Sequence, residues 1–333
     1  MLALENIRSV LVIKPSSLGD VIHTLPAVHF LKSARPDLSI HWLVNPEWAP
    51  LLAGNRDLEG VIEFPRNHFR GPGGLFKLAT WMKKTEWPDF DLALDFQGLA
   101  RSGFLAKFSR AREIYCLEDA ELVARQLAHR VVPSKRDIHA VSRYLKLVSD
   151  LGVPVKGPLE FPLPVGERPL ALRDRPHDDP FLLLHPFSRG PRKSLGQAEI
   201  EALCAAMQPL RVVVVGRSES NLTLPANGVD LVNRTSISEL IWLIRHAHFT
   251  VSVDSGPMHI AAALTDRLLG IHTWSDPRIV GPCNPKAWVW KNGEVHQVQS
   301  LETASGLDGA QGFTARHLPA VVGFLKTRCL QGT

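Results

Sequence analysis

Cysteine is scarce in this sequence, and no two cysteines are close enough to form a C-x-x-C pair. The 333 residues include four, at Cys116, Cys204, Cys283 and Cys329. Widely separated cysteines without a paired motif predict reduced thiols in a cytoplasmic protein.

Long apolar runs are also absent. No stretch of about 18 apolar residues occurs, and residues 1–8 carry neither a basic n-region followed by an apolar run nor a cleavage site. These absences predict a chain that is neither exported nor membrane-spanning. The net charge of +5 is a modest basic excess, which suits an anionic ligand or surface and falls short of a nucleic-acid-binding tail.

The loop after the first predicted strand lacks the glycines of a nucleotide-binding loop. Val10–Ile13 is followed by Lys14-Pro-Ser-Ser-Leu-Gly-Asp-Val-Ile-His-Thr-Leu-Pro26, in which Gly19 stands alone and no lysine follows it. This spacing excludes both the dinucleotide fingerprint and the Walker loop, and it disfavours a nicotinamide-dependent oxidoreductase. The conspicuous group here is a carboxylate, that of Asp20.

What the sequence does have is an alternation of short apolar runs with longer stretches of helical period, which predicts α/β structure with doubly wound parallel sheets. The predicted strands form one set in each half of the chain. They are residues 10–13, 40–44, 60–64 and 92–96, and then 181–185, 211–215, 231–233, 250–253 and 269–273.

A proline-rich stretch separates the two sets of strands. Residues 154–180 contain seven prolines, too many for a strand or helix interior. We therefore predict an N-terminal domain over residues 1–153, a linker over 154–180 and a C-terminal domain over 181–333, with a cleft at the carboxyl ends of the strands. The segment 314–325 predicts a final amphipathic helix, interrupted by Pro319.

The second half carries a candidate anion site. The predicted strand 250–253 leads through Asp254-Ser255-Gly256 into an alanine-rich helix, with Pro257 in its first turn. The free N–H groups and the positive dipole end of such a helix attract an anion, although an ordinary capped helix fits the same pattern. Arg192-Lys193 and Glu219 follow two other strands, so three loops offer cations, a carboxylate and a helix N-terminus. That combination suits a diphosphate and sugar hydroxyls.

These residues resemble a known family, the ADP-heptose:lipopolysaccharide heptosyltransferases of glycosyltransferase family 9. The resemblance rests on the segment 14–26, on Leu94-Asp-Phe-Gln-Gly-Leu-Ala-Arg-Ser102, on His185-Pro186 with Lys193, on residues 253–264, and on Ser275-Asp-Pro-Arg278 with Gly281-Pro282. It implies a GT-B fold of two Rossmann-like domains with an interdomain cleft, the acceptor on the first domain and the nucleotide sugar on the second. It also allows the final helix, predicted over 314–325, to pack back across the first domain. It also implies an inverting, metal-independent transfer of heptose from ADP-heptose to the lipopolysaccharide inner core, without a cofactor.

The resemblance assigns Asp20 as the catalytic base. An acceptor hydroxyl must lose a proton as it attacks the anomeric carbon, and a carboxylate can take that proton. The alternative interpretation of Asp20 is a helix cap. Pro26 predicts that the regular helix begins near Thr24, which would leave Asp20 in a looser turn. Ser16 and Ser17 either bind the acceptor or close the turn.

The resemblance also implies the residues of the donor site. Asp254 would hold sugar hydroxyls, Ser255 and Gly256 the diphosphate, and either Lys193 or Arg192 would neutralise the leaving ADP. Glu219 would bind the ribose and the backbone of Thr235 the adenine. Ser188 and His259 complete the predicted donor site, although a histidine in the position of His259 is more often a packed core residue.

On the acceptor side the predicted residues are Gln97 and Arg101, next to a basic cluster between residues 101 and 136 that suits an anionic glycolipid. Most of that cluster is interpreted as a solvated helix face. A glycolipid acceptor implies loose contact with the cytoplasmic face of the inner membrane.

Three other interpretations stay open. They are a nucleotide-sugar epimerase on the same two-domain plan, a family 9 transferase that uses another acceptor or sugar, and a non-catalytic binding protein.

Asp89-Phe-Asp91 has the Asp-x-Asp form of a metal-binding motif but precedes a strand, so it is predicted to be a surface turn at the wrong end of the sheet.

Overall fold

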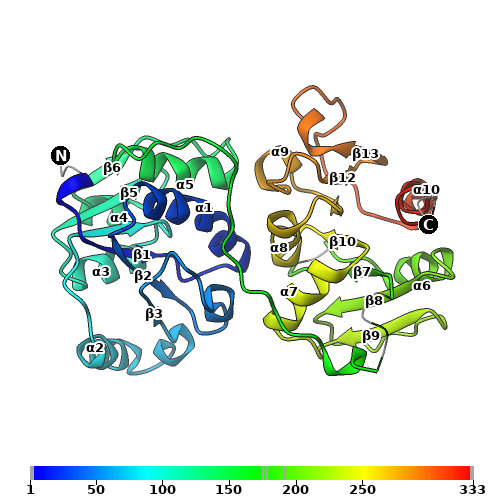
Figure 1. Cartoon of the computed structure of the whole chain (residues 1–333), viewed down its shortest axis with the longest axis horizontal. Helices are drawn as coiled ribbons and strands as arrows, with labels where there is room; N and C mark the ends of the chain where they lie inside the picture. The colour runs from blue at the N-terminus through cyan, green and yellow to red at the C-terminus, as the bar shows by residue number, and fades with distance from the viewer. Residues whose placement is uncertain (1–3, 175, 177–178, 191–192, 331–333) are drawn as a thin grey trace. The chain divides into compact units, whose positions relative to one another are not determined.

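A six-stranded parallel sheet forms the centre of the N-terminal part of the chain (Figure 1). In the computed structural model, which describes residues 4–174, 176, 179–190 and 193–330, its strands lie in the order β3-β2-β1-β4-β5-β6. Their bounds are β1 (Ser9–Ile13), β2 (Ser39–Val44), β3 (Gly60–Glu63), β4 (Leu92–Asp95), β5 (Glu113–Leu117) and β6 (Arg130–Val132). The four strands predicted in this half are confirmed.

The last two strands of this sheet, β5 and β6, were not predicted. They lie inside the basic region that was interpreted mostly as a solvated helix face, and that interpretation is wrong for these strands. β5 has the sequence Glu-Ile-Tyr-Cys-Leu and is buried after its first residue, yet charged residues flank it on both sides. The charges lie on the loops and helices around a buried strand.

Five helices cover the two faces of this sheet. They are α1 (Leu18–Ala34), α2 (Gly74–Lys84), α3 (Ala100–Phe108), α4 (Leu122–Leu127) and α5 (Ala140–Ser149), with short 3-10 helices η1 (Leu4–Asn6), η2 (Ala49–Leu52) and η3 (Arg66–Phe69). α1 packs against α5, and α3 against α4. The core under α2 and α3 includes Leu11 and Ile13 from β1, whose side chains share one face of the sheet because strand residues alternate.

The C-terminal part of the chain contains a seven-stranded sheet in the order β13-β12-β11-β10-β7-β8-β9. The strands are β7 (Phe181–His185), β8 (Arg211–Gly216), β9 (Gly228–Val232), β10 (Phe249–Val253), β11 (Leu268–His272), β12 (Trp288–Lys291) and β13 (Glu294–Gln297). Every pairing is parallel except that of β12 with β13. All five strands predicted in this half are present, and the hairpin β12–β13 is an addition.

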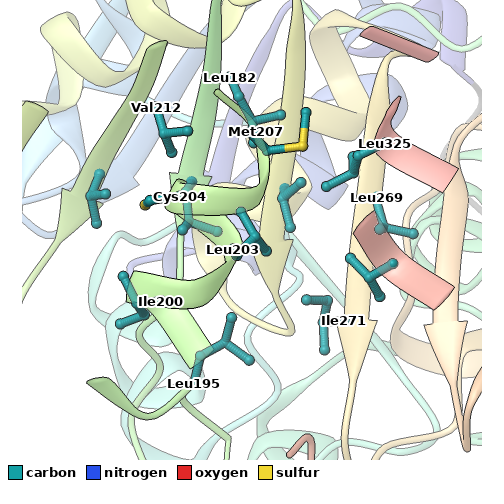
Figure 2. Close-up of a cluster of buried hydrophobic side chains, with 14 of the residues drawn as sticks. Leu182, Leu195, Ile200, Leu203, Cys204, Met207, Val212, Leu269, Ile271 and Leu325 are labelled. Atoms are coloured by element: carbon teal, nitrogen blue, oxygen red, sulfur yellow. The ribbon is translucent and has the colours of Figure 1, made fainter. Parts of the chain in front are cut away.

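The helices of this part are α6 (Gln197–Ala206), α7 (Ile237–His246), α8 (Gly256–Leu264), α9 (Pro277–Val280) and α10 (Leu318–Cys329), with η4 (Leu170–Leu172), η5 (Val298–Ser300) and η6 (Ala315–His317). Figure 2 shows the core under α6, where Leu203 and Cys204 face the sheet residues Leu182 and Val212. These four side chains are fully buried. Burial of this apolar face against the sheet holds α6 in place.

The last helix begins later than the sequence predicted. Pro319 does not interrupt it, because the regular helix starts at Leu318 and the proline occupies its first turn, where no intrahelical N–H bond is needed. Its buried residues Leu318, Val321, Leu325 and Cys329 belong to the C-terminal core.

The chain divides into two units, Met1–Pro164 and Val165–Thr333. The division falls inside the proline-rich stretch 154–180, whose described residues form only the 3-10 helix η4. No helix in the described part of the chain is long and apolar enough to cross a membrane.

Candidate functional site

In the N-terminal unit, polar residues gather where β1 and β4 end. The two strands are neighbours, with Ile13 opposite Asp95, so the residues that follow them lie at the same sheet edge. Lys14 comes directly after β1 and its side chain is only 3% exposed. Its Nζ donates to the carbonyl oxygen of Phe96 at 2.9 Å and to the hydroxyl of Tyr144 at 2.8 Å. A buried ammonium group therefore lies behind the loop that carries Asp20.

Asp20 lies in the first turn of α1, and three groups donate to its carboxylate. Its Oδ2 accepts from the amide of Ser17 at 3.0 Å and from the hydroxyl of Ser17 at 2.7 Å, and its Oδ1 accepts from the hydroxyl of Tyr144 at 3.2 Å. The Nζ of Lys14 is 3.8 Å from Oδ1. The side chain is still 37% exposed, so a substrate can reach this carboxylate.

The prediction that the regular helix begins near Thr24 is wrong. α1 starts at Leu18 and contains Pro26 in its interior. The contacts between Ser17 and Asp20 close the N-terminus of the helix, and one missing proline N–H within a helix of 17 residues does not move its start. Asp20 is thus a helix-capping residue, as the alternative interpretation held, and its capping bonds also fix the direction of the carboxylate.

The charges around Asp20 keep it ionised. Burial by its neighbours would raise the pKa of Asp20, but Lys14 and the hydrogen bonds from Ser17 and Tyr144 outweigh that effect and hold the pKa below its usual value. Burial raises the pKa of Tyr144 well above 10, and the nearby Asp20 charge adds to this. The tyrosine hydroxyl therefore stays protonated and donates a hydrogen bond to the carboxylate. Burial lowers the pKa of Lys14, against the opposing effect of Asp20.

Three of the predicted acceptor residues come together at this edge. The Oε1 of Gln97 accepts from the amide of Ser16 at 3.2 Å, which joins the loop after β4 to the loop after β1. Ser17 closes the turn through Asp20, one of the two roles left open for it. Arg101 lies on the first turn of α3 with an exposed side chain.

The turn that presents Gln97 is held by a buried carboxylate that the sequence analysis did not assign. The Oδ1 of Asp95 accepts from the amides of Gln97 and Gly98, each at 3.0 Å, and the hydroxyl of Ser102 donates to its Oδ2 at 2.9 Å. Burial raises the pKa of Asp95 to about 6 despite these bonds. Its role is to shape the loop, since it is only 2% exposed.

The Asp-x-Asp motif lies at the opposite edge of the sheet. Asp91 comes before β4, and its Oδ2 accepts from the amides of Arg8 and Ser9 at the start of β1. The prediction that this motif is at the wrong end of the sheet is confirmed. Among the described residues, no group of three or more His, Cys, Asp or Glu side chains is arranged to hold a metal ion.

In the C-terminal unit the candidate donor site forms at the carboxyl end of β10. Asp254 follows the strand, Ser255 is the N-cap of α8, and Pro257 is in the first turn, as the sequence predicted. The first backbone amides of α8 thus have no partner within the helix and present the positive dipole end. Gly256 begins the helix.

Asp254 is the centre of the polar contacts in this unit. Its Oδ2 accepts from the hydroxyl of Ser275 at 2.8 Å and lies 3.5 Å from the Nζ of Lys193, and its backbone oxygen accepts from the hydroxyl of Ser188 at 2.9 Å. Burial would raise the pKa of Asp254, but His272, Ser275 and Lys193 outweigh it and lower the pKa. The structure therefore joins Ser188, Lys193 and Asp254, three of the predicted donor residues.

Lys193 lies between a carboxylate and an aromatic ring. Its Nζ is 4.8 Å from the centroid of the Trp274 ring, and that indole is 58% exposed. The ion pair with Asp254 and the ring together orient the ammonium group. Arg192, the other candidate for this cation, lies outside the described residues.

Two buried histidines support this edge. Nδ1 of His185 is 3.2 Å from the hydroxyl of Ser255, and Nδ1 of His272 is 3.0 Å from the hydroxyl of Ser275. Because the single hydrogen of the Ser275 hydroxyl goes to Asp254, the hydrogen between His272 and Ser275 must come from Nδ1 of the histidine. Burial lowers the pKa of His185 and of His272 to about 4, so both rings are neutral at pH 7.

The remaining predicted donor residues lie in loops at the same sheet edge or in α8. Glu219 is exposed in the loop after β8, and Thr235 follows β9 and donates to the carbonyl of Leu231 at 3.0 Å. Asn233 and Ser218 join these two loops by hydrogen bonds of 2.6 and 3.2 Å. His259 is buried in α8 with 7% exposure, which agrees with a packed residue better than with a ligand-facing one.

Several residues of these two clusters were missed as site residues. Lys14, Asp95, His185 and Ser275 stood in the quoted motifs without a role, and a lysine at the end of an apolar strand was a usable signal. Tyr144 and His272 gave no signal, because each lies in a different segment from the carboxylate that it supports. Their roles depend on tertiary contacts alone.

Comparisons with a family model and with curated proteins point to the same family. A family model described as glycosyltransferase family 9 (heptosyltransferase) matches residues 80–308. Lipopolysaccharide heptosyltransferase 1 of Pseudomonas aeruginosa is 27% identical over 297 residues, which are 82% of this chain and 80% of that protein.

Solved structures also resemble the chain over nearly its whole length. The structure of the E. coli ADP-heptose lps heptosyltransferase II has a TM-score of 0.75 at 21% identity and covers 97% of this chain and 99% of that one. E. coli heptosyltransferase WaaC with ADP has a TM-score of 0.72 at 21% identity, with 96% and 99% covered. These likenesses confirm the predicted fold class, two Rossmann-like parallel-sheet units of the GT-B type.

Proposed function

The chain belongs to glycosyltransferase family 9 (heptosyltransferase), and on that premise we propose that it transfers a heptose from ADP-heptose to a lipopolysaccharide inner-core acceptor, with inversion and without a metal ion. The relative from Pseudomonas aeruginosa is a lipopolysaccharide heptosyltransferase, and the E. coli structure is that of an ADP-heptose enzyme. The observation that carries the proposal is the ionised, partly exposed carboxylate of Asp20.

The proposed reaction is a single displacement. The acceptor hydroxyl oxygen forms a bond to the anomeric carbon of the heptose, the bond from that carbon to the phosphate oxygen breaks, and its electron pair leaves with ADP. The hydroxyl proton passes to Asp20, whose lowered pKa keeps the carboxylate unprotonated at pH 7. Attack on the face opposite the leaving group inverts the anomeric centre.

The C-terminal unit supplies the donor site in this proposal. The N-terminal amides of α8 would bind the diphosphate, and Asp254 would accept hydrogen bonds from sugar hydroxyls. Lys193, already oriented by Asp254 and Trp274, would offset the negative charge that develops on the leaving ADP, a role that metal ions fill in other transferases. Glu219 and Thr235 would contact the ribose and adenine. No cofactor is required.

The acceptor is proposed to bind at the other edge described above, over Ser16, Gln97 and Arg101. Since an inner-core acceptor is a membrane glycolipid, we also propose peripheral contact of this protein with the cytoplasmic face of the inner membrane. The basic excess of the chain supports this proposal.

The test is ADP release from ADP-heptose in the presence of a chelator, with and without a truncated inner-core acceptor. We expect release only with acceptor, and a product whose anomeric configuration is opposite to that of the donor. Release without acceptor would favour an epimerase or hydrolase, and binding without release would favour a non-catalytic binder or another acceptor. Loss of release on chelation would overturn metal independence.

Asp20→Asn should abolish turnover while leaving the affinity for ADP-heptose largely unchanged, because only the proton acceptor is lost. The matched control is Asp89→Asn, which changes an exposed aspartate at the opposite sheet edge. Unchanged turnover in Asp20→Asn would exclude Asp20 as the base.

A further inference from the structure

The segment from η3 through α2 has an unusual charge distribution. Between Pro65 and Thr85 there are five basic residues and no acidic one. The basic residues are Arg66, Arg70, Lys77, Lys83 and Lys84. None of the five forms an ion pair with any described residue. Their charge is therefore available to an external partner.

One side of α2 is attached to the N-terminal core. Leu78, Trp81 and Met82 are partly buried against the core cluster of that unit. The ring of Trp81 lies 5.2 Å from that of Phe64 and 5.9 Å from that of Trp87, in edge-on contacts. These aromatic contacts hold the helix on the unit by one face.

The first turn of α2 exposes two large apolar residues. Leu75 is 85% exposed and Phe76 is 76% exposed, the two highest values among the exposed large apolar side chains of the described residues. They follow Gly71-Pro-Gly-Gly74 at the beginning of the helix, labelled α2 in Figure 1. Two consecutive apolar side chains that are almost fully exposed are not accounted for by packing in this unit.

We infer that Leu75 and Phe76, together with the basic residues around them, form a surface that docks on an anionic lipid bilayer. This surface, the α2 surface, consists of Arg66, Arg70, Leu75, Phe76, Lys77, Lys83 and Lys84. The inference deepens the proposed function, on which it rests, by naming the surface that contacts the membrane of the acceptor.

The composition of the α2 surface favours a bilayer over other partners. An interfacial helix inserts apolar side chains at the level of the headgroups and places lysine or arginine beside the lipid phosphates. Phe76 and Lys83 are seven residues apart, so they lie on the same side of α2 and can contact one plane together. The absence of acidic residues removes the repulsion that an anionic surface would otherwise meet.

The experiment is vesicle cosedimentation of the full chain without substrates. The probes are vesicles of phosphatidylcholine alone and vesicles with about 30 mol% phosphatidylglycerol, a content that gives an anionic surface potential. We expect binding only to the anionic vesicles, with a strong decrease when salt rises from about 0.1 M to about 1 M, since the Debye length falls from about 10 Å to about 3 Å.

The double variant Leu75→Ser/Phe76→Ser should bind the anionic vesicles at least about tenfold more weakly, because the apolar insertion is lost. The matched control is Val165→Ser/Leu170→Ser, which also removes two exposed apolar side chains, 74% and 66% exposed, from the other unit. The control should bind like the unchanged protein. Because all four side chains are exposed, thermal unfolding should be the same in both variants.

Three outcomes would overturn the inference. The first is no binding to anionic vesicles, and the second is an equal loss of binding in both double variants. The third is self-association, measured by sedimentation velocity, that only Leu75→Ser/Phe76→Ser abolishes; this result would make a second copy of the chain the partner. Transfer to an acyl-free acceptor in solution is measured separately. If heptose transfer fails while vesicle binding is observed, the proposed function is wrong and the docking surface stands. If transfer is observed while vesicle binding fails, the proposed function stands and the docking surface is wrong.

Discussion

Replacing Lys14 with methionine should raise the pKa of Asp20 and shift the acid side of the pH–rate profile upward. Lys14 contributes a buried positive charge 3.8 Å from Oδ1 of Asp20, and this charge favours the ionised carboxylate. Methionine has a similar length and no charge. If Asp20 is the base, the enzyme is active only where Asp20 is unprotonated, so a higher pKa means that activity is lost at a higher pH.

The size of the shift follows from the distance and the exposure. Two unit charges about 4 Å apart interact by about 4 kcal/mol at an effective dielectric constant of about 20. Asp20 is 37% exposed, and solvent screening at such a site reduces the interaction to about 1–1.5 kcal/mol. Since one pKa unit corresponds to about 1.4 kcal/mol, we expect the pKa of Asp20 to rise by about one unit.

The assay is kcat/KM for acceptor-dependent ADP release from about pH 3 to about pH 9, a range that includes the acid side of the profile, because this ratio reports ionisations of the free enzyme. Tyr144→Phe is a second variant; it removes one donor to Asp20 and should shift the profile in the same direction by about half a unit. The matched control is Tyr115→Phe. Tyr115 is the only other tyrosine of the chain, it is equally buried in the N-terminal unit, and its removal should leave the profile unchanged.

An acid side that does not move in Lys14→Met would refute the reasoning. It would mean either that Lys14 is uncharged in the folded protein or that Asp20 is not the group whose ionisation controls the rate. A shift of equal size in Tyr115→Phe would show that the profile responds to general loosening of the unit.

Three further predictions concern the C-terminal unit. Ser275→Ala removes the hydroxyl that donates to Asp254, so the affinity for ADP-heptose should fall about tenfold while the affinity for ADP stays the same. Calorimetric titration with each ligand measures the two affinities. An equal loss of affinity for both ligands would contradict a sugar-binding role for Asp254. Gly216→Ala should destabilise the unit by about 1–3 kcal/mol, since Gly216 has φ of +125° and a Cβ there would lie 2.9 Å from Cδ2 of Phe187. The control Gly152→Ala, at φ of +86° with no neighbour within 4 Å, should lower the free energy of unfolding by less, as measured by thermal unfolding. An equal loss in both variants would assign the effect to φ alone. His185→Gln should make the stability depend less on pH on the acid side, because burial lowers the pKa of His185 to about 4 while the unfolded chain, with a pKa near 6.5, binds the proton more readily. This contribution to stability is present above about pH 6.5 and is lost toward about pH 4, by about 3 kcal/mol in all. Urea unfolding at a series of pH values measures it, and an unchanged pH dependence of the free energy of unfolding would count against a neutral buried ring.

The sequence determined the two sheets, because buried parallel strands are continuous apolar runs that alternate with helices. Nine strands were predicted and all nine are present, in two sets separated by the proline-rich stretch. It also determined the beginning of α8, since Ser255, Gly256 and Pro257 are local signals for a helix N-terminus. Where the pattern was less apolar, as in β5 with its charged flanks, the strand was missed.

Tertiary structure alone decided which groups act on the two carboxylates. Tyr144 is 124 residues from Asp20 and donates to it, and Lys193 is 61 residues from Asp254 and pairs with it. The start of α1 was decided locally, because the capping contacts between Ser17 and Asp20, three residues apart, outweigh the effect of Pro26. Periodicity and spacing describe neighbours along the chain. The pKa of a carboxylate depends on charges and hydrogen-bond donors within a few ångströms in space, and only the packing of α1 against α5, and of β7, β10 and β11 side by side, brings those groups there.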